Sequence, residues 1–189
     1  MFNGKLNIVF GSLYLVVTAA LGPYMVTRLL PQVDEAAQAR QQALSQLQLA
    51  AQGGYENQET LEPMSDGEIA RMVADALLRL NAWLNSRGQV DAVKGGAHAH
   101  GNLEALLNIA AGLVLLFMGS APGWYRATTA LAFVGGALLH SGALYLGTVF
   151  AQGWALALLG TGIGPLLVLL GLLLLGIGAA LWLRPPAAG

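Results

Sequence analysis

The chain has 189 residues, of which 56% are hydrophobic and 10% are charged, whereas roughly a quarter of the residues in an average soluble domain are charged. This composition argues against a water-soluble globular protein, and the net charge of −1, without a run of Lys or Arg, argues against a nucleic-acid partner. Because the sequence contains no cysteine, it also excludes disulfides, thiolate metal sites and iron–sulfur clusters.

Long uncharged stretches of the sequence predict transmembrane helices. A helix needs about 20 apolar residues to cross the hydrocarbon core of a bilayer. Stretches of this kind predict four such helices, at residues 1–30, 98–120, 127–149 and 154–183. The predicted fold class is therefore all-α, an integral membrane four-helix bundle whose main partner is the lipid bilayer.

The first apolar stretch has a second interpretation, as a secretory signal peptide. Lys5 precedes it, and residues 17–19 are similar to a cleavage site. A retained helix is favoured, because the apolar run continues to Leu30 and is longer than the apolar region of a typical signal peptide.

Residues 31–97 are polar and are expected to form a helical extramembrane segment. Ser65 and Glu68 have the spacing of a capping box. The apolar residues after them follow the spacing of an amphipathic helix that ends at Gly88: Ile69, Met72, Val73, Ala76, Leu77, Leu80 and Leu84. A second, more polar helix is predicted for residues 34–51. The apolar stripe can cap the bundle, lie on the membrane surface or dock a partner, and a cap is favoured because the polar face lacks the Lys and Arg of a surface-seeking helix.

Single basic residues next to the predicted helices indicate the orientation. Lys5 precedes the first helix, Arg126 lies between the second and third, and Arg184 follows the fourth. Basic residues in short loops favour the cytoplasm. We therefore predict a protein of a bacterial inner membrane with both termini in the cytoplasm and residues 31–97 in the periplasm.

A few polar residues interrupt the apolar stretches, and such residues usually face the interior of a bundle and mark a site. In the predicted topology they all fall in the outer half of the membrane: Tyr24, Thr27, His98, His100, Asn102, Glu104, Asn108, His140, Ser141 and Tyr145. At 100° per residue, His100, Glu104 and Asn108 share one face of their helix with glycines and alanines, and leucines cover the other face.

These residues leave more than one interpretation open. His100 and His140 are expected either to make structural hydrogen bonds, for example to Glu104, or to ligate a haem or a metal. Glu104 alone is a poor proton pathway, because no further carboxylates follow it. The spacing of Gly160 and Gly164 is typical of helix packing rather than of a ligand site.

Short motifs resemble those of the styrene oxide isomerases, a family of small four-helix membrane enzymes. They are Ala99-His100-Gly101-Asn102, Tyr145, and Gly164-Pro165-Leu166-Leu167. The resemblance implies a b-type haem bound between subunits of a trimer, whose ferric iron acts as a Lewis acid on an epoxide oxygen to give a carbonyl product. It implies that His100 is the metal ligand and that Tyr145 orients the epoxide. The family's helix-two Asn is replaced by Leu106, with Asn102 and Asn108 as displaced substitutes.

Three functions follow as hypotheses. The first is a haem-binding isomerase of small hydrophobic epoxides, with catalytic residues Tyr145, Asn108 and Asn102 and cofactor-binding residues His100, His140 and Glu104. The second is an electron carrier whose haem has both His100 and His140 as ligands. The third is a non-catalytic subunit of a larger membrane complex. A homo-oligomer or a complex with other membrane subunits is expected in each case.

Overall fold

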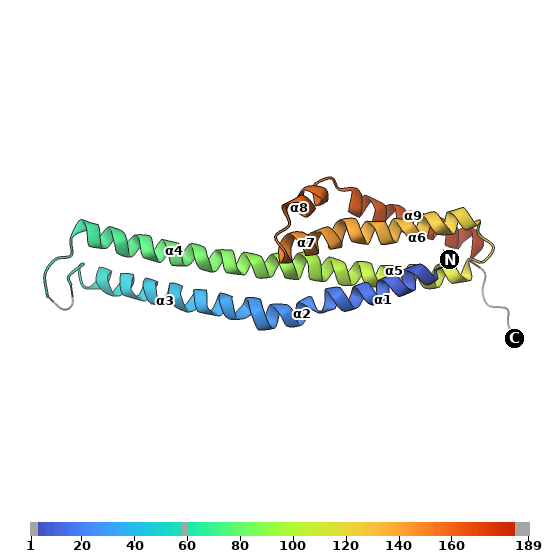
Figure 1. Cartoon of the computed structure of the whole chain (residues 1–189). Coiled ribbons are helices and arrows are strands. Elements are labelled where there is room, and N and C mark those ends of the chain that lie inside the picture. The colour runs from blue at the N-terminus through green and yellow to red at the C-terminus, as the bar shows by residue number, and fades with distance from the viewer. Residues whose placement is uncertain (1–3, 58–59, 184–189) are drawn as a thin grey trace. The chain divides into compact units, whose positions relative to one another are not determined.

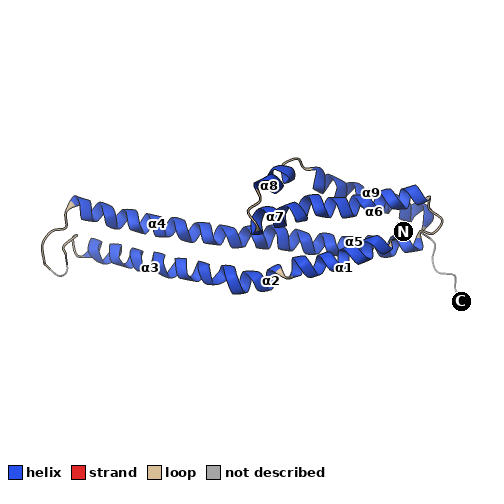
Figure 2. Ribbon diagram, in the orientation of Figure 1, coloured by secondary structure: helices blue, strands red, loops and turns tan. Residues whose placement is uncertain are grey.

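The structure is a computed structural model that describes residues 4–57 and 60–183. Within these residues every named element is a helix, and Figure 2 shows blue helices joined by tan loops. Four helical stretches are long and apolar enough to cross a membrane: Lys5–Gln52, Asp66–Phe117, Gly123–Val149 and Ile163–Trp182. The predicted all-α membrane bundle is thereby confirmed, and the chain is a multi-pass membrane protein.

The chain divides into two compact units. The bundle unit consists of Met1–Pro23 and Ala92–Gly189, and the hairpin unit of Tyr24–Asp91. The helices of the bundle unit are α1 (Lys5–Ala19), α2 (Leu21–Tyr24, at the border of the two units), η2 (Ala92–His98), α5 (Ala99–Phe117), α6 (Gly123–Ala137), η3 (Leu138–Gly142), α7 (Ala143–Val149), α8 (Gly153–Leu159) and α9 (Ile163–Trp182). The segments η2 and η3 are π-helical, which means that their turns contain one more residue than those of an α-helix.

Within the bundle unit, α1 lies along α5, α6 lies along α9, and α5 also contacts α6 (Figure 1). Glycines allow this close approach. A Cβ atom at Gly164 of α9 would lie 2.6 Å from the backbone nitrogen of His140, and one at Gly101 of α5 would lie 2.8 Å from the Cβ atom of Thr18. At Gly164 the glycine spacing therefore serves helix packing, as the sequence predicts.

Aromatic side chains mark the two ends of the bundle unit. Trp124 at the start of α6 is 69% exposed, and the ring of Trp182 at the end of α9 lies 4.8 Å from that of Tyr125. Trp154, which is 60% exposed, lies at the start of α8, near the other end of α9. Such residues concentrate at membrane–water interfaces. The 20 residues of α9 span about 30 Å, which matches the hydrocarbon core.

Several ends of the helices differ from the predicted boundaries. The helices predicted for residues 1–30 and 98–120 are parts of longer helical stretches, Lys5–Gln52 and Asp66–Phe117. Residues 154–183, expected as one helix, form α8 and α9, because Gly162 adopts a positive φ of 70° and precedes the new helix. The third transmembrane helix begins at Gly123, four residues before the predicted start at residue 127, and continues through η3 to the end of α7.

The hairpin unit contains η1 (Met25–Leu29), α3 (Leu30–Gln52) and α4 (Asp66–Asp91). The helices α3 and α4 run side by side in opposite directions (Figure 1). The capping box is confirmed, because the backbone N–H of Ser65 donates to Glu68 Oε2 at 2.8 Å and the N–H of Glu68 donates to Ser65 Oγ at 3.3 Å. The predicted helix over residues 34–51 is confirmed within α3.

Two features of α4 differ from the amphipathic helix that the sequence predicts. The expected end at Gly88 is wrong, because the helix continues through this glycine to Asp91. Only part of the apolar stripe is covered: Ala76 is buried, whereas Leu77 is 60% exposed and Leu84 52%. What covers the exposed part of the stripe stays a prediction.

Candidate functional site

Three helices of the bundle unit bring polar side chains to one carboxylate. The Nδ1–H of His140 donates to Oε1 of Glu104 at 2.5 Å, and the hydroxyl of Ser141 donates to Oε2 at 2.5 Å. The hydroxyl of Tyr14 lies 2.9 Å from Ser141 Oγ and donates to it in this arrangement. Tyr14 comes from α1, Glu104 from α5, and His140 and Ser141 from η3. We call these four residues the Glu104 cluster.

The π-helical turn explains how two neighbouring residues reach one carboxylate. In a regular α-helix successive side chains point about 100° apart. His140 and Ser141 lie in the wider turn of η3, and both contact Glu104. Such turns occur frequently at functional sites. The sequence predicted both His140 and Ser141 in the polar layer of the outer half of the membrane, but nothing in its pattern indicated a π-helical turn.

Burial makes these hydrogen bonds necessary. Glu104 is 4% exposed and Ser141 is fully buried. An ionised carboxylate that is removed from water requires hydrogen-bond donors or a positive charge to compensate for its lost hydration. His140 and Ser141 each supply one donor, one to each oxygen, which fixes the carboxylate group in a single orientation.

The outer side of the cluster is a pair of histidines. The side chain of His140 is 16% exposed, and its ring lies 4.8 Å from the ring of His100 at an angle of 58°. His100 is exposed on the surface of α5. Among the described residues, no hydrogen bond is made by Nε2 of His140 or by either ring nitrogen of His100. These nitrogens are therefore available to a ligand.

The structure decides between the two histidines as partner of Glu104. The sequence left open a hydrogen bond from either His100 or His140 to a carboxylate or a carbonyl. The hydrogen bond is made by His140, which lies on a different helix from Glu104. His100 lies one turn before Glu104 on the same helix, where its ring contacts His140 instead.

A series of side-chain hydrogen bonds continues from Glu104 deeper into the bundle. The side-chain amide of Asn108 donates to the backbone oxygen of Glu104 at 2.9 Å, and that of Asn7 donates to Oδ1 of Asn108 at 2.9 Å. Asn108 is 1% exposed and Asn7 is fully buried. Asn108 therefore connects helices, and its expected part in positioning a substrate stays a prediction.

The other residues that the sequence selected occupy separate places. Asn102 Oδ1 accepts a hydrogen bond from Thr18 Oγ1 at 2.8 Å, and Nδ1 of His98 lies 3.0 Å from the backbone oxygen of Thr18. The ring of Tyr145 packs against Phe150 at 5.9 Å. Tyr24 and Thr27, expected in the same polar layer, belong to the hairpin unit.

The sequence interpretation missed the contribution of the first helix. Asn7, Tyr14 and Thr18 each bond to a residue of α5 or η3, yet they lie in a stretch that was treated only as an apolar span. A signal was present in their spacing. With Gly11 they recur every three or four residues, which places them on one face of the helix.

The histidine pair brings only a few possible metal ligands together. In the described part of the chain, no group of three or more His, Cys, Asp or Glu residues is placed to hold a metal ion. A haem needs only one or two axial ligands from the protein. Metal–nitrogen bonds of about 2 Å place two imidazoles on opposite sides of one iron with their ring centres about 6 Å apart. At 4.8 Å and tilted, His100 and His140 are too close for that arrangement.

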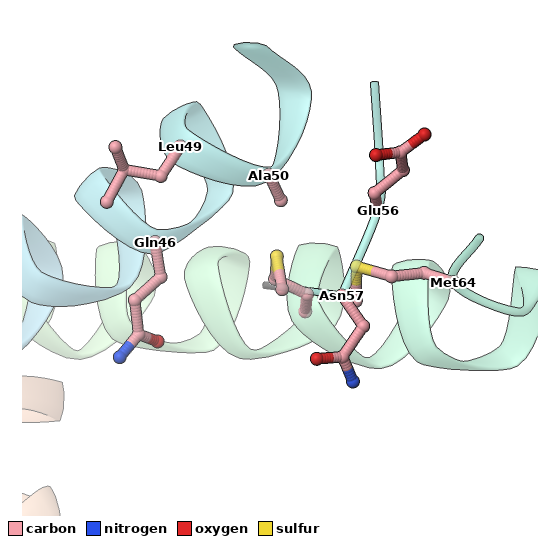
Figure 3. Close-up of a pocket in the computed structure, with 7 residues that line it drawn as sticks. Gln46, Leu49, Ala50, Glu56, Asn57 and Met64 are labelled. Carbon is pink, nitrogen blue, oxygen red and sulfur yellow. The ribbon is translucent and has the colours of Figure 1, made fainter. Parts of the chain in front are cut away.

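A cavity in the hairpin unit contains none of the selected residues. It has a volume of about 250 Å³ and is lined by Gln46, Leu49, Ala50, Glu56, Asn57, Met64 and Met72. Figure 3 shows the Glu56 carboxylate pointing away from Asn57, so the polar groups do not converge on a common point. The cavity therefore offers no site comparable to the Glu104 cluster.

No protein-family model matches the chain, and no curated protein or solved structure matches it. Function has to be inferred from the residues and their contacts alone.

Proposed function

We propose that the chain is a membrane haem protein whose cofactor binds at the face formed by His100 and His140. The observation that carries the proposal is the hydrogen bond from Nδ1 of His140 to Glu104. A histidine that ligates a metal almost always donates its other ring N–H to a carboxylate, a carbonyl or water, which fixes its tautomer and raises its basicity. This hydrogen bond leaves Nε2 of His140 as a lone-pair donor at the surface of the bundle.

The exposure of His100 supports the same face. The 19 residues of α5 are just long enough to cross the hydrocarbon core, so His100, its second residue, lies near one boundary of the membrane. Polar side chains inside a membrane usually face protein or a cavity. A bound cofactor would shield this imidazole from lipid, and a second copy of the chain beside it would complete the cover.

The residues of the cluster have defined tasks in this proposal. Glu104 holds the proton on Nδ1 of His140, and Ser141 with Tyr14 holds the second oxygen of Glu104. When bound, a ferric haem supplies a Lewis acid or a one-electron carrier. Because His100 and His140 lie on the same side, the geometry favours one protein ligand and one open face. This supports the isomerisation of a small hydrophobic epoxide over electron transfer with two histidine ligands.

Absorption spectra of the detergent-purified protein, expressed with haem supplied, test the proposal. We expect a Soret band that is lost in His140→Ala and is unchanged in His98→Ala, the matched control whose Nδ1 faces a backbone oxygen. Loss of the band in His100→Ala alone would assign the ligand to His100, as the family resemblance implies. A purified protein that stays colourless although haem was supplied during expression would refute haem binding.

Ligand addition separates the two haem functions. An open iron position predicts that cyanide shifts the Soret band of the ferric protein and that a hydrophobic epoxide is converted to a carbonyl compound. Glu104→Gln should raise the reduction potential, because it removes the negative charge behind His140. A low-spin spectrum that is insensitive to cyanide would instead support an electron carrier with two protein ligands.

We also propose that both termini lie in the cytoplasm of a bacterium, with residues 31–97 in the periplasm. Lys5 at the start of α1 and Arg126 in the first turn of α6 lie at the same end of the bundle unit, because Gly4 packs against Gly112 near the end of α5. The chain contains no cysteine, so single cysteines can report the topology. In intact cells an impermeant maleimide should label Thr60→Cys and should leave Ser120→Cys unlabelled, and the reverse pattern would contradict this orientation.

A further inference from the structure

Two arginines contact the ring of Trp83 in the hairpin unit. The guanidinium carbon of Arg40 on α3 lies 4.1 Å from the centre of the Trp83 ring, and that of Arg87 on α4 lies 5.4 Å from it. Both distances are within the range of a cation–π contact. The aromatic ring therefore brings two positive charges from different helices to one place.

No negative charge in the described chain neutralises this pair. The only ion pairs among residues 4–57 and 60–183 are Arg79 with Asp75 and His140 with Glu104. The Nε atom of Arg40 is shielded from solvent and has no hydrogen-bond acceptor. Because this N–H is shielded, a ligand would contact Arg40 through the terminal nitrogens of its guanidinium, which form no ion pair among the described residues.

We propose that Arg40, Trp83 and Arg87 form a binding site for a dianionic phosphate group. Guanidinium groups present several N–H donors in a fixed plane, a geometry that matches the oxygens of phosphate. Two guanidiniums carry two positive charges, which complement inorganic phosphate or a phosphate monoester, with a charge near −2 at neutral pH. A phosphodiester, such as the headgroup of phosphatidylglycerol, carries a single charge and complements the pair less well.

Trp83 provides the signal for the test, because its ring contacts both arginines. In the full-length protein, Trp124, Trp154 and Trp182 are replaced by Phe, so that Trp83 is the only tryptophan. The protein is purified in a neutral detergent and titrated with sodium phosphate at pH 8, with sodium chloride at equal ionic strength as the reference. We expect a saturable change of Trp83 emission with phosphate and none with chloride.

Charge variants identify the residues involved. Arg87→Gln and Arg40→Gln should each raise the dissociation constant for phosphate at least tenfold, and Arg40→Lys should fall between Arg40→Gln and the unmodified protein. Arg71→Gln is the matched control, since Arg71 lies on the same helix and bonds only to the backbone oxygen of Gly67. It should leave the dissociation constant within twofold.

Three outcomes would overturn the proposal. The first is an emission that does not saturate with phosphate, and the second is a dissociation constant that Arg87→Gln leaves unchanged while circular dichroism shows an intact helical protein. In the third, nanodiscs with phosphatidylglycerol change the emission without phosphate and phosphatidylcholine discs do not, which would assign the pair to a lipid headgroup instead.

Discussion

Ser141→Ala measures how strongly the Glu104 cluster stabilises the bundle. The substitution removes the hydroxyl that donates to Glu104 Oε2 at 2.5 Å and leaves almost no cavity. Interhelical hydrogen bonds in membrane proteins contribute about 0.6 kcal/mol on average, whereas hydrogen bonds to charged groups contribute about 1.5–3 kcal/mol. Ser141 is fully buried and Glu104 nearly so, so water cannot replace the lost donor. We therefore expect the free energy of unfolding to fall by about 1.5 kcal/mol.

Unfolding in mixed micelles of increasing dodecyl sulfate content, followed by circular dichroism, measures this change. Thr148→Val is the control, because Thr148 donates only to the backbone oxygen of Leu144 on its own helix. Its cost should stay below about 0.5 kcal/mol. Equal costs for the two variants would show that the carboxylate does not depend on Ser141, and the proposed fixed orientation of Glu104 would be refuted.

Two further predictions concern helix packing and pH. Gly164→Ala should destabilise the bundle by about 1–3 kcal/mol, because the new Cβ meets the backbone of η3. The control Gly176→Ala should be neutral or stabilising, because nothing lies within 4 Å of a Cβ at this position. Equal unfolding midpoints of the two variants would contradict the close approach of α9. Hydrogen bonds from Ser65 lower the pKa of Glu68 below its ordinary value. At pH values above the ordinary Glu pKa of about 4.3, the capping box therefore stabilises the start of α4 fully. This stabilisation is lost as the pH falls through the lowered pKa of Glu68. The protection factors for amide hydrogen exchange in the first turn of α4 should therefore fall in acid. Ser65→Ala removes the hydroxyl donor but keeps the backbone N–H donor to Glu68, so it should weaken this pH dependence. An unchanged pH dependence in that variant would assign the effect to another group.

The sequence predicts the membrane-spanning architecture and one face of α5 well, because both depend on local periodicity. Glu104 and Asn108 are buried, and Leu103 and Leu106 are exposed, as a 3.6-residue period requires. The end of α4 was wrong for a related reason. A glycine such as Gly88 costs only about 1 kcal/mol inside a helix, so it ends a helix only when the backbone turns there.

The arrangement of the site depends on contacts between segments that are distant in the sequence. Tyr14 and Glu104 are brought together by the packing of α1 on α5, and the π-helical turn of η3 directs both His140 and Ser141 to the same carboxylate. No local pattern determines which of two histidines bonds to Glu104. Periodicity places residues on a face, but the partner of each residue is fixed only by tertiary packing.

The cluster shows an order of polarity that supports the proposed ligand position. Deep in the bundle, Asn108 satisfies its amide with backbone oxygens and accepts a hydrogen bond from Asn7. In the middle, both oxygens of Glu104 accept hydrogen bonds from η3. Only the outer end, at His140 and His100, has ring nitrogens without partners among the described residues. Apart from Asn7 Oδ1, which is buried and unpaired, the unsatisfied polar atoms of this network face outward. Each inner residue fixes the one outside it, so the network holds Nδ1 of His140 on Glu104 and leaves Nε2 for the proposed ligand.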